Sequence, residues 1–392
     1  MQVAHKIQLN PNRTQETYFR KACGISRFSW NWALAHWEEE FKKGGKPSGM
    51  SLKKEFNRIK GESYPWIFEV TKYAAQQPFL DLQDAWKRFF SKLGGRPNFK
   101  KKGKCRDSFY VGGDQIKVSL RKIWIPNLGW VRLHEKLRFQ GKINSVVVSR
   151  TADRWFAAIQ VETQIQFQPS ENQEAVGIDL GIHRLATLSN GVTFSAPKPL
   201  QRLQRRLKRK QRAYSKKVKG SANAFKHRME ISRLHMHIAN IRKDTLHKIS
   251  TWLISQFREV GIEDLNVKGM MANHCLARAI SDLGFYELRR QLEYKAKWRG
   301  GTIHLHERFF ASSKTCSKCG QKNADLTLSD RLFHCPSCNH KIDRDLNAAR
   351  NLDPVPEVRR EFTPEEMTAL LKRVGPVTAT SIDETGNQLS AA

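Results

Sequence analysis

The positive charge of this chain limits what it can fold into more than any other feature. Lys and Arg number 69 against 37 Asp and Glu, which gives a formal net charge of +32 at pH 7. A compact body with such a surplus repels itself unless a polyanion neutralises the charge. Basic clusters recur with Trp, Tyr and Phe among them, and this combination favours a nucleic-acid partner over a merely soluble basic surface.

The length and the distribution of apolar residues indicate the class of protein. A chain of 392 residues is too long for one compact core, so we expect two to four domains. No window approaches the ~18 consecutive apolar residues that cross a bilayer. The first residues, MQVAHKIQLNPNRTQ, also lack the apolar core of a secretory signal. The sequence therefore disfavours a membrane protein and a secreted one.

The N-terminal half combines one strand, a helical segment and a set of short strands. VAHKIQL at residues 3–9 alternates as a strand does, and apolar spacings of three and four predict helices from Thr14 to about Leu93. Residues 108–163 hold short apolar runs separated by Gly, Pro and Asn, which predicts an all-β barrel or sandwich. The first strand would complete it, so the helices become an insertion. The polar segment 166–174 is the expected linker.

The C-terminal half has the element order of an α/β domain. Residues 175–196 contain three predicted strands, with a hairpin turn at Asn190-Gly191. Helices then alternate with strands, and SDLGFYELRRQLEYKAKWRG is predicted as one helix. In the tail after residue 353, Thr363 and Glu366 have capping-box spacing before an amphipathic helix. The last residues are expected to be disordered.

The densest basic stretch follows the three strands. From Arg202 to Lys248 there are 16 Lys and Arg but only two acids. Two apolar stripes in this stretch predict a pair of helices around the loop at 215–222. A solvent-facing helix pair is the plain alternative, but the charge favours nucleic-acid contact. The candidate contacts are Arg205, Arg206, Lys208, Arg209 and Lys210.

Two acidic residues follow apolar strands of the predicted α/β domain. Asp179 lies in AVGIDLGI, where flanking glycines on the same side would leave room for a metal and a phosphate. Glu263 lies near the end of VGIEDLNV, and ligands gather at the carboxyl ends of strands in open α/β sheets. Asp264 competes with Glu263, but it would face the opposite side of a strand.

A third acid, Asp345, lies in IDRDLNAARNL. Asp343 is the expected N-cap, so Asp345 falls in the first helical turn, where the helix dipole alone could explain it. Ala348 and Ala349 share its face and would let the helix pack close to the sheet. Each acid alone has an ordinary explanation. Together with Asp179 and Glu263 they predict a site for two Mg²⁺ ions that hydrolyses a phosphodiester.

The cysteines give the strongest local pattern. Two Cys-x-x-Cys pairs are separated by 15 residues, and four thiolates at this spacing suit a closed, structural Zn²⁺ site. A redox dithiol is the alternative from one pair, but two pairs favour zinc. The histidines nearby are not needed as ligands. The predicted ligands are Cys316, Cys319, Cys335 and Cys338.

The ordered series GIDLGI, IEDLNV, SSKTCSKCG…CPSC and DRDLNAARN resembles the TnpB family, and HKIQLNPNRTQ, GISRFSWNWAL and PNLGW extend the likeness over roughly residues 3–352. That family consists of transposon-encoded RNA-guided DNA endonucleases related to compact type V CRISPR effectors. The resemblance implies an N-terminal wedge-type β-barrel with a helical insertion, then an RNase H-like (RuvC) α/β domain interrupted by a zinc ribbon.

The implied domains, by residue number, are as follows: wedge-type barrel 1–12 and 108–165; helical recognition lobe 13–107; linker 166–174; RuvC-like nuclease domain 175–310 and 341–353; zinc ribbon 311–340; C-terminal tail 354–392. The family's catalytic acids fall on Asp179, Glu263 and Asp345, and its zinc ligands fall on the four cysteines above. In similar proteins the helix matching VTKYAAQQPFLDL contacts a short duplex motif, which assigns that contact to Lys72 and Gln76.

The resemblance also implies the partners and the reaction. They are a transposon-end guide RNA and double-stranded target DNA, with no membrane and no obligate protein partner, in a prokaryotic cytoplasm at the nucleoid. One RuvC centre using Mg²⁺ would cut both strands beside the adjacent motif. Two alternatives stay open: a nuclease-inactive guided repressor or transposition accessory protein, and a DNA-joining transposase that needs no RNA.

Overall fold

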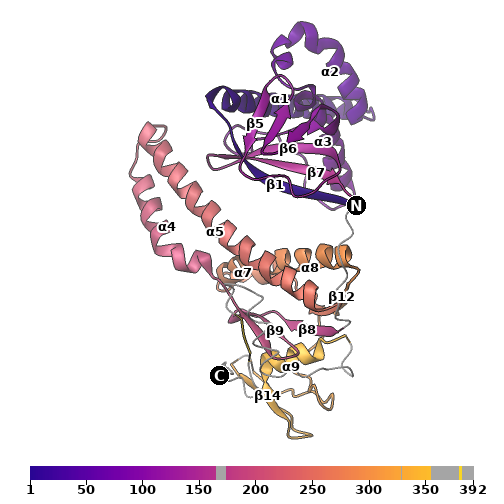
Figure 1. Ribbon diagram of the computed structural model, residues 1–392, viewed down its shortest axis with the longest axis vertical. Coiled ribbons are helices and arrows are strands. Elements are labelled where there is room, and N and C mark those ends of the chain that lie inside the picture. Colours follow the sequence, from indigo (N-terminus) through magenta and orange to yellow (C-terminus); the bar gives the residue numbers. More distant parts are fainter. Residues whose placement is uncertain (165–173, 328, 355–378, 382–392) are drawn as a thin grey trace. The chain divides into compact units, whose positions relative to one another are not determined.

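The computed structural model describes residues 1–164, 174–327, 329–354 and 379–381, and it divides into two compact units, Met1–Ile165 and Gln166–Ala392 (Figure 1). Nearly all of the expected linker and the predicted tail helix lie outside the described residues. Residues 379–381 form a strand, although the sequence predicted disorder there. None of the helices among the described residues is long and apolar enough to span a membrane.

The first unit is built on an antiparallel sheet of seven strands with the order β2-β6-β7-β1-β5-β4-β3. β1 pairs with β7 from Gln2↔Glu162 to Leu9↔Trp155, so the first strand of the chain joins the later strands as predicted. The strands are β1 (Gln2–Asn10), β2 (Ser108–Gly112), β3 (Lys117–Ser119), β4 (Lys122–Ile125), β5 (Gly129–Leu133), β6 (Lys142–Thr151) and β7 (Arg154–Glu162).

The predicted barrel is not closed. Among the described residues, β2 pairs with β6 alone and β3 pairs with β4 alone, so the sheet keeps two edges. A short 3-10 turn, η2 (Gly113–Gln115), separates β2 from β3, and the helices pack against β2. β3 has only three residues, so it offers too short a ladder to close the sheet.

The helices of this unit are inserted between β1 and β2, as the sequence predicts. They are α1 (Arg13–Lys42), α2 (Gly49–Ser63), the 3-10 turn η1 (Pro65–Glu69) and α3 (Lys72–Phe90). Asn12 begins α1 with a capping box, and Pro78 lies within α3 rather than at its start. Phe19 joins the helices to the sheet, because its ring lies 5.0 Å from that of Trp155 and both are buried.

The second unit contains a mixed six-stranded sheet with the order β12-β11-β8-β9-β10-β15. β8, β11 and β12 are parallel, whereas β9, β10 and β15 join by antiparallel pairing. Its strands are β8 (Ala175–Asp179), β9 (Arg184–Leu188), β10 (Val192–Ser195), β11 (Glu259–Glu263), β12 (Thr302–His306) and β15 (Ala379–Ser381). Gly191 has a positive φ of 87° between β9 and β10, which confirms the predicted turn.

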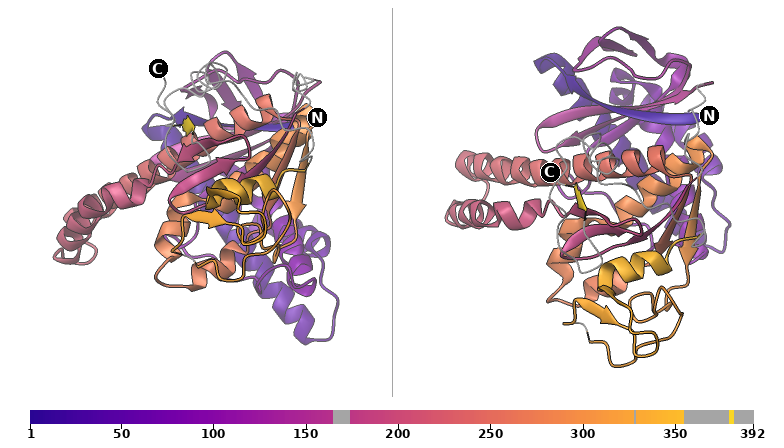
Figure 2. Two further views of the ribbon diagram at one scale, coloured as in Figure 1. Left: turned by 90° about the horizontal axis from the view of Figure 1, so that it is seen from below. Right: turned by 60° about the horizontal axis from the view of Figure 1, so that its bottom comes forward.

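Helices lie on both faces of this sheet (Figure 2). They are α4 (Pro199–Ser215), α5 (Ala222–Gln256), α6 (Val267–Ala272), α7 (Ala277–Leu283), α8 (Phe285–Arg299) and α9 (Arg344–Asn351). Val176 and Ile178 pack into the core formed with α5 and α8. The helix predicted from SDLGFYELRRQLEYKAKWRG is broken at Gly284, whose left-handed φ of 76° ends α7 and begins α8.

α4 and α5 form the predicted basic hairpin. Leu207, Leu234 and Ile238 are buried between the two helices, and the hairpin extends beyond the sheet (Figure 2). The contact between α4 and α5 is thus formed by the predicted apolar stripes, and most of the basic side chains of the two helices stay exposed.

Candidate metal centres and nucleic-acid interface

Asp179 and Glu263 end two neighbouring parallel strands. Ile178 on β8 pairs with Ile262 on β11, so each acid follows its paired residue at the carboxyl end of its strand. The sheet therefore brings the two acids to one edge, where open α/β sheets bind ligands.

Asp345 comes to the same edge on α9. Asp343 caps this helix through its side chain, which accepts hydrogen bonds from the backbone N–H groups of Asp345 and Leu346 at 3.0 Å each. The cap fixes the first turn and so the place of Asp345, and the predicted N-cap is confirmed. Arg344 lies beside the acid, with Nη2 3.6 Å from Asp345 Oδ1.

Close approach between α9 and the sheet depends on two glycines. Gly177 and Gly261 pair in register on β8 and β11. A Cβ on Gly177 would lie 2.0 Å from the carbonyl oxygen of Ala349, and one on Gly261 would lie 1.8 Å from that of Leu352. Gly177 is one of the glycines beside Asp179 that were predicted to leave room for a metal and a phosphate, and for Gly177 this is wrong, because the backbone at the end of α9 fills that space.

The pKa of Asp179 indicates that the carboxylates of Glu263 and Asp345 lie near it. Burial raises the pKa of Asp179 well above its usual range, and the negative charges of Asp345 and Glu263 raise it further. A carboxyl group whose pKa is raised by two neighbouring carboxylates is typical of a site for divalent cations, whose preferred ligands are carboxylate oxygens.

Asp264, the competitor of Glu263, has a different role. Its carboxylate forms ion pairs with Arg289 and Arg308, and hydrogen bonds from these two guanidinium groups lower its pKa. Asp264 is thus an ion-pair partner, whereas Glu263 accepts a hydrogen bond from the hydroxyl of Ser312.

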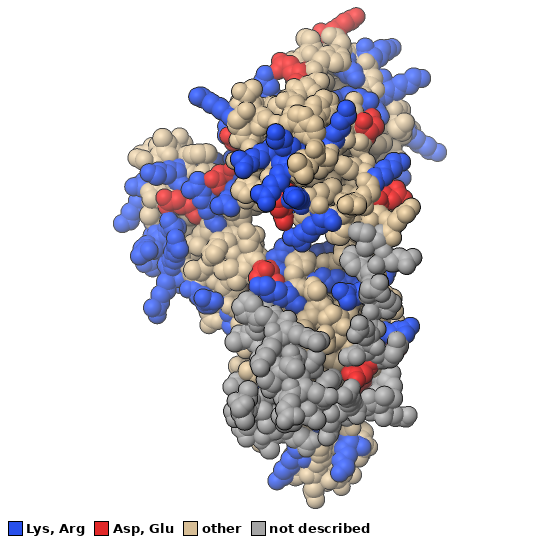
Figure 3. All heavy atoms as spheres, in the orientation of Figure 1, with Lys and Arg blue, Asp and Glu red and all other residues tan. Residues whose placement is uncertain are grey.

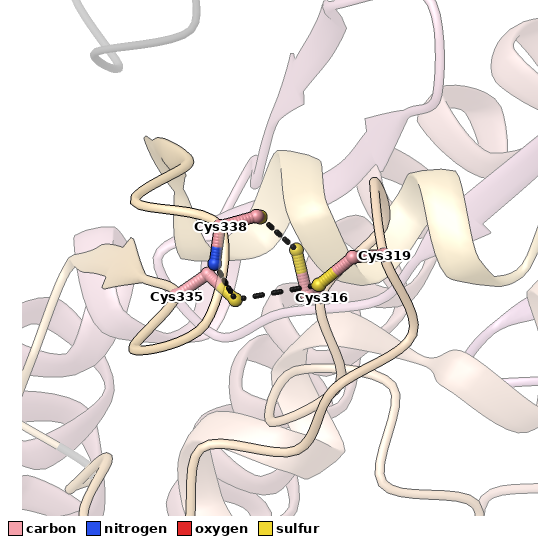
Figure 4. Close-up of side chains that lie close together, drawn as sticks. All are labelled: Cys316, Cys319, Cys335 and Cys338. Atoms are coloured by element: carbon pink, nitrogen blue, oxygen red, sulfur yellow. Dashed lines mark hydrogen bonds between the residues drawn. The ribbon is translucent and has the colours of Figure 1, made fainter.

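The four cysteines converge within the ribbon, whose short strands are β13 (Leu332–His334) and β14 (Lys341–Asp343) (Figure 4). Their sulfur atoms all lie within 4.8 Å of one another, and the backbone N–H of Cys338 donates to Cys335 and lowers its pKa to about 6. Four converging thiols fit tetrahedral Zn²⁺. Among the described residues this is the one group of three or more His, Cys, Asp or Glu side chains whose ligand atoms lie close enough together to hold one ion, so the three acids lie farther apart than the four thiols.

Two asparagines connect the ribbon to the helix that carries Asp345. Asn347 accepts from the Ser317 backbone N–H at 2.9 Å and donates to the Thr315 carbonyl at 2.7 Å. Asn351 donates to the carbonyls of Ser312 and Thr315, each at 2.7 Å. The sequence analysis missed both, although amides four residues apart on one helix face are a readable signal.

A cavity of about 410 Å³ lies beside Glu263. Its wall contains basic and aromatic side chains together with the acid Glu293, which is paired with Arg289, and Tyr286 is 68% exposed. The charged and aromatic lining residues include Lys268, Tyr286, Arg289, Arg290 and Arg308. Such a wall suits a nucleic-acid strand next to the acids.

The predicted contacts on the basic hairpin divide into two groups. Arg205, Arg206, Lys208 and Arg209 are exposed on α4, and Figure 3 shows Lys and Arg side chains over this hairpin. Lys210 differs, because its Nζ lies 2.7 Å from Glu230 Oε2 on α5 and the side chain is half-buried. This ion pair joins the two helices, so Lys210 is engaged within the hairpin.

Lys72 and Gln76 lie one turn apart at the start of α3 in the first unit. Lys72 is exposed, with Nζ 3.9 Å from Asp114 Oδ2, whereas Gln76 is half-buried. Asp114 also accepts from the hydroxyl of Tyr73 at 2.7 Å.

Three family models match the chain. The OrfB_IS605 model, described as a probable transposase, matches residues 158–274, and the Cas12f1-like TNB domain matches residues 285–352. A model described as a helix-turn-helix domain matches residues 1–46, where the structure has a strand and the uninterrupted helix α1.

Similar proteins cover most of the chain. "Putative RNA-guided DNA endonuclease InsQ" of Escherichia coli K12 is 35% identical over 367 residues, which are 89% of this chain and 91% of that protein. A "Putative RNA-guided DNA endonuclease" of Streptomyces pristinaespiralis is 36% identical over 360 residues, 89% of this chain and 88% of that protein. A solved Cas12f1–sgRNA–target DNA complex shares the fold, with a TM-score of 0.54 at 16% identity over 86% of this chain and 82% of that one. The chain belongs to the TnpB family of OrfB_IS605 proteins.

Proposed function

We propose that this chain is an RNA-guided, Mg²⁺-dependent endonuclease of a transposable element, which cleaves double-stranded DNA beside a short adjacent motif. The observation that carries the proposal is the meeting of Asp179, Glu263 and Asp345 at one sheet edge, where the latter two raise the pKa of the first. The names of the relatives from E. coli and Streptomyces support the RNA-guided part.

The three carboxylates are the proposed ligands for Mg²⁺. Divalent ions bound there would lower the pKa of a water nucleophile and stabilise the leaving oxygen of the phosphodiester. Paired strands fix the backbone of Asp179 and Glu263, the Asp343 cap fixes the first turn of α9 that carries Asp345, and the hydroxyl of Ser312 donates to Glu263. A single centre of this kind would cut the two strands in succession.

The second unit is proposed to be the nuclease domain. Its sheet places the antiparallel strands β10 and β9 beside the three parallel strands β8, β11 and β12, and this order supports an RNase H-like RuvC domain at residues 175–310 and 341–353. The four cysteines would hold a structural Zn²⁺ in the ribbon at 311–340. The side-chain amides of Asn347 and Asn351 donate hydrogen bonds to the ribbon, so an ordered ribbon would hold α9 in place.

The first unit is proposed to bind the guide RNA and the adjacent motif. The open sheet (1–12 and 108–165) serves as the wedge-type domain and the helices (13–107) as the recognition lobe, with 166–174 as linker and 354–392 as tail. Lys72 and Gln76 would face the motif duplex, since both side chains can contact base edges in the major groove. Exposed Arg205, Arg206, Lys208 and Arg209 would contact phosphates, independently of sequence.

The test is plasmid cleavage by the purified ribonucleoprotein with Mg²⁺, compared with the same reaction in EDTA. Sequencing the copurified RNA identifies the guide, and a plasmid library with a randomised flank supplies the adjacent motif. Asp179→Ala or Glu263→Ala should abolish cutting and leave RNA binding within about twofold, because neither acid lies on a proposed RNA-binding surface.

The matched control is Asp264→Asn, which removes the neighbouring acid that pairs with arginines instead. It should retain cutting. Stable guided binding without metal-dependent cutting across the whole flank library would instead identify a guided repressor, and strand joining without RNA would identify a transposase.

A further inference from the structure

A small aromatic pocket opens on the first unit, far along the sequence from the acids. Its volume is about 200 Å³, and it lies where the last turns of α1 and α3 come together. We call it the aromatic pocket. Its walls are made mainly by Trp37, Phe41, Trp86, Phe89, Phe90 and Arg96.

The rings of the aromatic pocket form a layered stack. Trp37 and Trp86 are almost parallel, with centroids 5.8 Å apart and planes at 11°. Phe90 stacks on Trp86 at 5.7 Å and 23°. The guanidinium of Arg96 lies 6.0 Å from the Trp86 ring. Such an array offers flat π-faces to a further planar group.

Part of this stack is open to solvent. Phe41 is 60% exposed and Phe90 is 61% exposed. The buried indole N–H of Trp86 also has no acceptor within the part of the chain that the structure describes. Exposed apolar side chains gathered around a pocket mark an interaction site.

The charge around the aromatic pocket indicates the occupant. Residues 85–106 contain nine Lys and Arg and no Asp or Glu. The acid in the lining, Glu38, is paired with Arg96 at 2.7 Å. Lys42 lines the aromatic pocket and is exposed, and Arg88 and Lys92, which lie within two residues of Phe90 in the sequence, are exposed as well. A second copy of this chain would bring like charges together, whereas a polyanion is attracted.

We propose that the aromatic pocket binds an unpaired base of the RNA partner, with the surrounding cations on its phosphates. Aromatic faces within a basic surface are the common way to hold unpaired nucleotides, and protein recognition of RNA concentrates on loops and ends with unstacked bases. The identity of the RNA as a resident partner rests on the proposed function. The aromatic pocket adds a base-stacking contact that phosphate binding alone does not supply.

The experiment compares Phe90→Ala with Phe68→Ala in the full chain. Phe68 is a matched control, because it is 56% exposed in the same unit and also has a lysine, Lys60, 5.7 Å from its ring. Affinity for the RNA that copurifies with the wild-type protein is measured at one fixed salt concentration. Ultraviolet cross-linking of the ribonucleoprotein, followed by peptide mapping, locates the contacted residues.

Phe90→Ala should weaken RNA binding about tenfold and remove ribonucleotide cross-links from the peptides that carry Trp37, Phe41 and Phe90, since one base stacked on an aromatic ring contributes roughly 1–3 kcal/mol. Phe90→Leu should bind the RNA more weakly than the wild type, because leucine lacks the flat ring. Phe68→Ala should bind the RNA with full affinity. Equal affinity of Phe90→Ala and Phe68→Ala with no cross-link at these peptides would overturn the proposal.

Three other results would also overturn it: cross-links to deoxyribonucleotides alone, a concentration-dependent dimer that Phe90→Ala abolishes, or equal losses of RNA affinity in both alanine variants.

A ten-nucleotide oligouridylate separates this proposal from the proposed function. If no RNA copurifies and no plasmid is cut, the guided-nuclease proposal fails. Cross-linking of the oligouridylate to the Phe90 peptide would still support the aromatic pocket, and its absence would reject it.

Discussion

Gly177 and Gly261 lie opposite each other on the paired strands β8 and β11, and the C-terminal end of α9 rests against both backbones. The two glycines therefore set the distance between α9 and the sheet. Because α9 carries Asp345 in its first turn, they also set the place of the third acid.

Alanine at either glycine should be strongly destabilising. The added Cβ would stand 2.0 Å from the Ala349 oxygen at position 177 or 1.8 Å from the Leu352 oxygen at position 261, and both obstacles are backbone. We expect Gly261→Ala to lower the free energy of unfolding of this unit by at least the ~1–3 kcal/mol typical of overpacking. Chemical denaturation followed by circular dichroism measures the loss.

Gly61→Ala is the control for this prediction, since a Cβ there meets nothing within 4 Å and Gly61 lies in α2. It should be neutral or stabilise the helix by up to ~1 kcal/mol. Wild-type stability in Gly261→Ala would contradict the close approach of α9 to the sheet.

Asn347 is expected to hold the ribbon against α9. It is fully buried, and Asn347→Ala leaves the Ser317 N–H without its partner, at a cost of about 1–3 kcal/mol, whereas the Thr315 carbonyl keeps its hydrogen bond from Asn351. We expect faster hydrogen exchange at the start of the ribbon and in α9. Cleavage should also need a Mg²⁺ concentration several-fold higher, because Asp345 is held less firmly.

Asn323→Ala is the matched control for Asn347→Ala. Asn323 donates to the His334 carbonyl at 2.9 Å and accepts from the backbone N–H of Asp325 at 3.0 Å, and both partners lie inside the ribbon. It should leave the Mg²⁺ requirement unchanged. An equal rise in that requirement for both variants would show that general loosening of the ribbon, rather than the bond to α9, is responsible.

Zinc removal should loosen the ribbon first. Its small core includes Phe333, Leu326 and Ile342 beside the cysteines, which is too little apolar surface to hold the ribbon without the metal. A chelator should accelerate hydrogen exchange in residues 313–343 and then in α9, while β1 and β7 in the other unit stay protected. Unchanged exchange in the ribbon after zinc loss, verified by metal analysis, would contradict a structural role for zinc.

The sequence predicted what depends on local pattern. Apolar alternation and turn residues located the strands, and Asp343 was recognised as a cap because Asp before a helix is a local signal. The apolar stripes of α4 and α5 predicted their seam, since a helix pair buries its apolar stripe.

What the sequence did not predict depends on partners distant in the chain. The single helix expected after residue 280 breaks at Gly284, where Arg242 and Leu246 of α5 leave little room for a Cβ. Nothing local distinguishes an exposed lysine from Lys210, whose partner Glu230 is 20 residues away. Gly177 was assigned to the wrong neighbour for the same reason, since its contact lies on α9.

Asp179 is predicted to reduce the stability of the metal-free protein. Its pKa is raised in the folded state, so the folded protein holds this proton more tightly than the unfolded chain, whose reference value is 3.8. As the pH rises above that value the unfolded chain ionises more readily, and the folded state loses stability until the pH passes the raised pKa. Above it the penalty is constant.

Asp179→Asn removes this penalty and should melt at a higher temperature than the wild type at neutral pH without Mg²⁺, by about 2–4 °C for each kcal/mol relieved. The difference should shrink as the pH falls through 3.8, because below this value Asp179 is protonated in both the folded and the unfolded wild type. Saturating Mg²⁺ should stabilise the wild type but not the variant, because the ions bind the carboxylates of the folded state. Calorimetry at several pH values, with and without Mg²⁺, measures each difference. A variant that melts below the wild type at neutral pH without Mg²⁺ would mean that the Asp179 carboxylate stabilises the fold, and the proposed ion site would lose its electrostatic basis.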